Sequence, residues 1–108
     1  MTSAGLAPRA LTDLALVIRS KNAGPTQLTI DVFLRDADAY AVCAESPALS
    51  CAAVALRYGL QFDQVQRHLL QDILAIKYVM PRTVVAGSPG DGDVYGAQQH
   101  GPMLEIVP

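Results

Sequence analysis

The side chains best suited to acid–base chemistry lie in one glycine-rich stretch near the end of the chain, residues 87–100, with the sequence GSPGDGDVYGAQQH. His100 titrates near neutrality and can move a proton, and Tyr95 can donate a hydrogen bond to a developing oxyanion. Asp91 adds a carboxylate between two glycines. The stretch has neither helical nor strand periodicity. We therefore expect a site-forming loop with Asp91, Tyr95 and His100 as catalytic candidates, and a solvated linker is the alternative.

The same stretch offers amides and a second carboxylate. Gln98 and Gln99 can orient a carbonyl or carboxylate group through their side chains. Asp91 and Asp93 stand two positions apart, a spacing that can present both carboxylates to Mg²⁺ or Ca²⁺. The acidic residue that closes a calcium loop is missing at the far end, and turn capping explains the Asp-Gly pairs more simply. We therefore assign Gln98 and Gln99 to substrate binding and predict no metal site.

A second motif, RSKNAGP at residues 19–25, carries the chemistry of an anion site. Arg19 can grip two oxygens with its planar fork, and Lys21 adds a point charge. Asn22 contributes an amide, while Gly24 lets backbone N–H groups approach a ligand. These residues predict binding of a carboxylate or phosphate group. The alternative is a solvated hairpin turn in which Asn22 and Gly24 only supply turn conformations.

A predicted hairpin positions this anion motif. The apolar run at residues 14–18 is rich in branched side chains, and residues 28–34 alternate between apolar and polar. The short connection between them favours antiparallel pairing. We expect this hairpin to form the centre of the sheet, with Val17, Ile30 and Val32 buried.

Two short helices are expected after the hairpin. The first covers residues 37–45 and is capped by Asp36 or Asp38. The second runs from Pro47 or Ser50 to Tyr58, before a glycine suited to a left-handed stop. Residues 62–74 favour a strand or short helix, and residues 75–80 a strand that Pro81 ends.

The whole pattern predicts one α+β domain over residues 1–108. It has a small mixed or antiparallel sheet with an N-terminal hairpin, two short helices on one face and a long Gly/Pro-rich C-terminal loop. Residues 1–11 are expected to form a loose arm, residues 83–102 the functional loop, and residues 103–107 a final edge strand.

Composition narrows the function classes. The chain is 51% hydrophobic and 17% charged over 108 residues, more apolar than a small free-standing domain usually needs, which favours an apolar partner surface. A formal charge of -2 without a dense Lys/Arg patch argues against nucleic acid. The sequence shows no signal-peptide pattern and no apolar run that could span a bilayer, so a cytoplasmic protein is expected. Cys43 and Cys51 lack metal-ligand spacing and are expected to be reduced thiols.

Three segments resemble a family of small bacterial proteins catalogued as a domain of unknown function. They are VIRSKNAGP with the following Leu-Thr-Ile-Asp strand, the Ala-Ile-Lys stretch that ends in Met-Pro-Arg, and the GSPGDGDVYGAQQH loop. The resemblance covers most of the chain. It implies a domain encoded beside, or fused behind, acyclic terpene utilisation (AtuA-like) proteins, often among genes for catabolism of branched organic acids and their coenzyme A thioesters.

The motifs and the resemblance together predict a small subunit or accessory domain of a bacterial catabolic enzyme with an AtuA-like large partner. The two motifs are expected to face one cleft and to bind a carboxylate or acyl-thioester substrate, with a lyase or hydratase as the reaction class. A noncatalytic module that stabilises or regulates the partner is the alternative. The sequence leaves open the cofactor and whether the chain forms a homo-oligomer.

Overall fold

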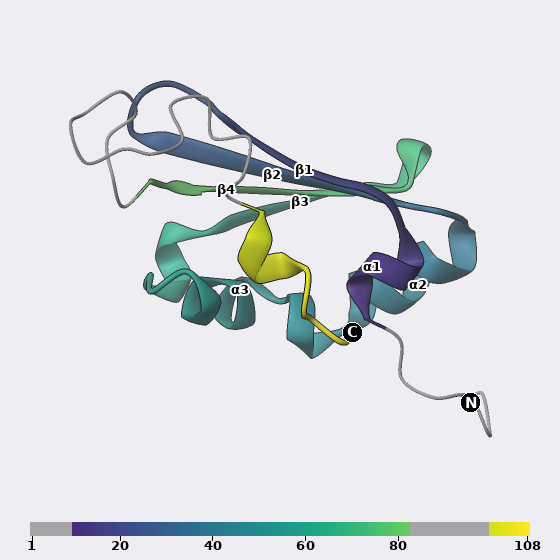
Figure 1. Cartoon of the computed structure of the whole chain (residues 1–108). Coiled ribbons are helices and arrows are strands. Elements are labelled where there is room, and N and C mark those ends of the chain that lie inside the picture. Colours follow the sequence, from purple (N-terminus) through teal and green to yellow (C-terminus); the bar gives the residue numbers. More distant parts are fainter. Residues whose placement is uncertain (1–9, 83–99) are drawn as a thin grey trace.

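A four-stranded antiparallel sheet organises the part of the chain that the computed structural model describes, residues 10–82 and 100–108. The strand order is β1-β2-β4-β3, so β2 and β4 are central and β1 and β3 are the edges. Figure 1 shows the α-helices together beneath the sheet. The bounds of the strands are Ala15–Asn22 for β1, Gln27–Leu34 for β2, Gln66–Leu70 for β3 and Ala75–Pro81 for β4. The predicted α+β fold is confirmed.

The hairpin of β1 and β2 forms as predicted, but it does not lie at the centre of the sheet. The turn passes through Gly24, whose φ of +100° is a backbone conformation that glycine adopts without a steric penalty. Ile30 and Val32 are fully buried on the helix side, whereas Val17 is 49% exposed. The prediction for Val17 is wrong because an irregularity between Ala15 and Val17 sets it opposite Phe33, on the outward face.

Two helices cover the inner face, as expected. Helix α2, Ala37–Glu45, starts where the Asp36 carboxylate accepts the backbone N–H of Ala39 at 2.8 Å. Helix α3, Cys51–Arg57, is capped in the same way by the Ser50 hydroxyl. Gly59 then takes φ +68°, the left-handed stop. No helix in residues 10–82 and 100–108 is long and apolar enough to cross a bilayer.

The C-terminal segment completes the core without adding a strand. Residues 103–107, predicted as an edge strand, belong to no strand, and Met103 is the last residue of the 3₁₀ helix Gly101–Met103. Met103 and Ile106 are fully buried, because this segment packs its apolar side chains onto the inner face instead of pairing its backbone with an edge. The short helix α1, Leu11–Leu14, lies beside it, and its Leu11 N–H donates to the Ile106 carbonyl at 2.7 Å. Leu14 is thus helical rather than part of the first strand.

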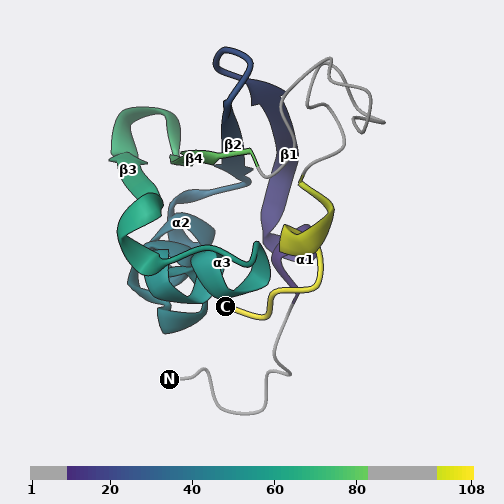
Figure 2. The same cartoon turned by 90° about the vertical axis from the view of Figure 1, so that its left-hand side faces the viewer.

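The outer face of the sheet carries none of the described α-helices (Figure 2). The side chains on this face are the alternate residues of each strand, because β2 turns Leu28, Ile30, Val32 and Leu34 into the core. The outward side chains of β2 are therefore Thr29, Asp31 and Phe33. This face matters for the anion motif, which lies partly on it.

Candidate functional site: two groups on either side of an edge strand

Strand β1 separates the predicted anion-binding residues onto two faces. Its register pairs Arg19 with Asp31 and Lys21 with Thr29, so both cations are on the outward face. Asn22 pairs with Leu28 and is on the inward face. Consecutive residues of a strand point to opposite sides, so neighbouring residues of the RSKN motif lie on opposite faces of the sheet. The sequence interpretation grouped all three residues, whereas the structure places Arg19 and Lys21 on one face and Asn22 on the other.

Arg19 is held in position by its neighbours on β2. Its Nε lies 3.5 Å from Oδ2 of Asp31, and its guanidinium lies over the Phe33 ring, 5.0 Å from the centroid. The Asp31 side chain is only 11% exposed while that of Arg19 is 58% exposed. The terminal nitrogens of Arg19 donate no hydrogen bond to residues 10–82 or 100–108. Arg19 thus directs the terminal N–H groups of an orientated guanidinium to solvent, the arrangement that recognises carboxylate and phosphate oxygens.

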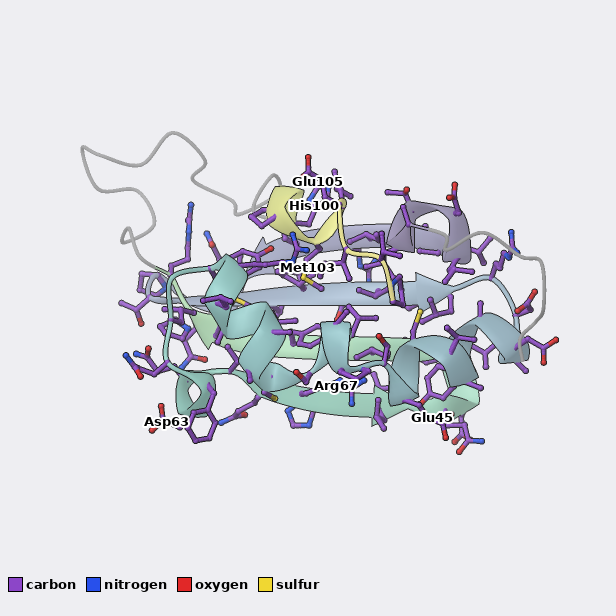
Figure 3. All side chains as sticks on the ribbon, turned by 90° about the horizontal axis from the view of Figure 1, so that it is seen from below. Glu45, Asp63, Arg67, His100, Met103 and Glu105 are labelled. Atoms are coloured by element: carbon purple, nitrogen blue, oxygen red, sulfur yellow. The ribbon has the colours of Figure 1, made fainter. Side chains whose placement is uncertain are left out.

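His100 lies on the other face, bonded to the serine of the same motif. The Ser20 hydroxyl accepts the His100 backbone N–H at 3.1 Å and lies 3.3 Å from Nδ1 of its ring. Ser20 is 6% exposed, and His100 is partly exposed. Figure 3 views the sheet from the helix side and shows His100 and Met103 on the segment that covers this part of it. The hydroxyl orders a catalytic candidate, a role that the sequence gave no reason to assign to Ser20.

Asn22 contacts an arginine that sequence reasoning also passed over. Its Oδ1 accepts a hydrogen bond from Nη1 of Arg82 at 3.0 Å, and Arg82 is 9% exposed. The Arg82 backbone N–H donates to Thr26 in the turn that contains Gly24. Arg82 therefore joins the end of β4 to the β1–β2 turn. An arginine directly after a strand-ending proline was the available sequence signal.

Among the described residues, the two motifs meet where Ser20 and His100 touch across 80 positions of sequence. Asp91, Tyr95, Gln98 and Gln99 lie outside the described residues, so their predicted roles stay predictions. The described candidates form an outward group of cations on β1 and an inward group around Ser20. The expected single cleft also stays a prediction, because most of the second motif is not described.

A further polar cluster beneath the sheet holds the fold together. Nη2 of Arg67 donates to the carbonyls of Cys43 and Ala44 at 3.2 and 3.0 Å, at the C-terminal end of α2. Nε of Arg67 donates to the Tyr78 hydroxyl, which donates to the Leu49 carbonyl at 2.6 Å. Burial raises the pKa of Tyr78, and burial raises the pKa of Cys43 to about 11 despite the nearby arginine. Both groups stay neutral near pH 7 and their contacts are structural.

A model of one protein family matches residues 11–107, and its description is "Domain of unknown function (DUF4387)". The chain belongs to this family. The DUF4387 match includes both motifs in full, from Arg19 to His100, so each candidate residue is part of the family's domain. No curated protein and no solved structure matches the chain.

Proposed function

We propose that this DUF4387 domain is a small subunit or accessory domain of a bacterial catabolic enzyme, with an AtuA-like larger chain as partner. In this proposal the domain holds the anionic group of a carboxylate or acyl-thioester substrate, and the assembled enzyme is a lyase or hydratase. The observation that carries the proposal is Arg19, whose guanidinium is fixed by Asp31 and Phe33 while its terminal nitrogens face solvent.

Fixing the arginine in advance favours ligand binding over a purely structural role. An arginine that only stabilised the sheet would direct its fork at a protein acceptor. Here the Arg19 Nε contacts Asp31, and the Phe33 ring packs against the guanidinium group. Little side-chain entropy is therefore left to lose when a ligand binds. Lys21, two positions along β1, adds a second positive charge on the same face.

The shape of the described surface favours an accessory role. Arg19 and Lys21 lie on an outward sheet face, and His100 lies on the inward face beside Ser20. These groups cannot meet at one reacting atom through the sheet. A partner chain that covers the outward face would supply the remaining walls and reacting groups of a closed site.

Two measurements test this proposal. Co-purification from the native host should yield a stable complex with a larger chain. Calorimetric titration of that complex with carboxylates and acyl thioesters should then show binding that Arg19→Ala weakens by about 1.5 to 3 kcal/mol, the range for a charge-assisted contact. Arg35→Ala is the matched control, because Arg35 is an exposed arginine that pairs with Asp36 at 3.8 Å and lies beyond the end of β2, outside the Arg19 row. Equal affinities of parent and Arg19→Ala would contradict the anion-binding role.

A noncatalytic interaction module is the second candidate, and the β3 edge favours it. Leu69, Leu70 and Ile73 are 50%, 38% and 57% exposed at one end of the sheet. Leu69 also lines an open hollow of about 350 Å³ between α2 and β3. Exposed apolar side chains beside a sheet edge are typical of protein contacts. If Leu69→Ser abolished assembly while Arg19→Ala left substrate turnover unchanged, this module would replace the enzyme-subunit proposal.

A further inference from the structure

Lys77, on the central strand β4, lies in the same row as Arg19. The register pairs Arg19 with Asp31, Asp31 with Lys77, and Lys77 with His68, so one row crosses all four strands on the outward face. Lys77 is half-buried, yet it makes no ion pair or hydrogen bond with any residue in 10–82 or 100–108. The carboxylate beside it, Asp31, forms its ion pair with Arg19 on the opposite side. An ammonium group without a carboxylate partner among the described residues is available to an anionic ligand.

The charges of this face do not balance. Arg19, Lys21 and Lys77 are its cations, and Asp31 is its one carboxylate among the described strand residues. The other outward positions of the four strands are uncharged when His68 is neutral. Two positive charges are therefore left over. A ligand with two negative charges is complementary to the face, whereas a monoanion leaves one cation unsatisfied.

The positions of the cations also indicate that the two negative groups of such a ligand are separated from each other. Arg19 and Lys77 are two strand spacings apart, about 10 Å between backbones, with Asp31 between them. Their long side chains can approach each other across part of that distance, but the Asp31 carboxylate repels an anion placed midway. A compact dianion would contact only the β1 side. A molecule whose two anionic groups are separated by several bonds can reach both.

We infer that Arg19, Lys21 and Lys77 form one binding site for a dianion with separated charges, such as a dicarboxylic acid or an acid that also carries a phosphate. This inference rests on the proposed function and narrows its substrate class. Arg19 and Lys21 hold one anionic group on the β1 side, and Lys77 holds the second on β4.

The test compares the affinities of ligands that differ by one charge. Binding to the isolated full chain is measured by NMR titration at constant ionic strength. Glutarate should bind about ten-fold more tightly than pentanoate, which has the same number of carbons, because it gains one charged contact at a partly exposed site. Lys77→Gln should abolish that advantage and leave pentanoate binding unchanged. Lys77→Arg should retain the advantage, which shows that charge and not packing is responsible. Arg35→Gln is the control for general loss of positive charge.

The outcomes separate this inference from the proposed function. A glutarate advantage that survives Lys77→Gln, or inorganic phosphate binding as tightly as glutarate with no effect of Lys77→Gln, would overturn the separated-dianion site. In either case Arg19-dependent binding of carboxylates by the complex would still support the proposed function. If Lys77→Gln instead prevented assembly with the larger chain and changed no ligand affinity, the row would be an acidic partner's docking surface, and the inference would be wrong.

Discussion

The hydroxyl of Ser20 determines how the ring of His100 can be used. Because the Ser20 oxygen accepts the His100 backbone N–H, its own proton is available to Nδ1, 3.3 Å away. A ring that accepts at Nδ1 carries its proton at Nε2 when neutral. In this tautomer the Nε2–H of His100 is the group offered to a ligand.

A buried thiol makes the stability of the domain sensitive to alkaline pH. Burial raises the pKa of Cys43 from 9.0 to about 11, with Arg67 opposing part of the shift. Below pH 9 the thiol is protonated in both folded and unfolded chains and stability is unaffected. Between pH 9 and pH 11 only the unfolded chain releases the proton, so the free energy of unfolding should fall by about 2 kcal/mol.

Urea denaturation at pH 8, 9, 10 and 11 checks this expectation. Cys43→Ala should show a smaller loss over the same interval. The losses at higher pH should remain in both proteins, because burial also raises the pKa values of Tyr58 and Tyr78. Parallel curves for parent and Cys43→Ala would show that the thiol does not contribute.

At the scale of elements, Arg67 connects an edge strand to a helix. It extends from β3 and donates to two carbonyls at the C-terminal end of α2, where a positive charge also interacts favourably with the helix dipole. Arg67→Met should lower the free energy of unfolding by about 1 to 3 kcal/mol, because it leaves these acceptors and the Tyr78 hydroxyl short of a partner. Arg57→Met is the matched control, since Arg57 makes a single exposed contact of 3.4 Å with the Pro102 carbonyl. Equal urea midpoints for the two variants would contradict this role.

The elements were predictable where a local pattern determines them. Alternation predicted β2, an aspartate cap predicted the start of α2, and the glycine stop predicted the end of α3, because period, capping and stop signals act within a few residues. The position of β1 at the edge and the outward direction of Val17 depend on pairing with distant residues. The same holds for residues 103–107, whose apolar side chains suit a strand and a core-covering segment equally. The contact of Ser20 with His100 is non-local too, so both residues could be noticed but not paired.

At the scale of the whole molecule, one core supports every element. Ile30 is fully buried among side chains of the helices and the C-terminal segment, so Ile30→Asp would place an unpaired charge there and should unfold the domain. Val17→Asp introduces the same carboxylate into the neighbouring strand, where the side chain is 49% exposed, and should cost less than about 1 kcal/mol. Circular dichroism melting of the two variants provides the measurement. A cooperative transition near the parental temperature for Ile30→Asp would refute the core assignment.

The hydrogen bond from Leu11 N–H to the Ile106 carbonyl has a consequence for how such a domain can be joined to other proteins. It brings the two ends of the folded unit to the same place, beneath the β1 edge. A larger chain could therefore be attached before residue 11, after residue 106, or on both sides as a host with this domain inserted in a surface loop, without disturbing the sheet. In all three arrangements the outward face would be presented from the same tether point. A separately expressed domain and a domain fused to a larger chain would then present the same face to that chain.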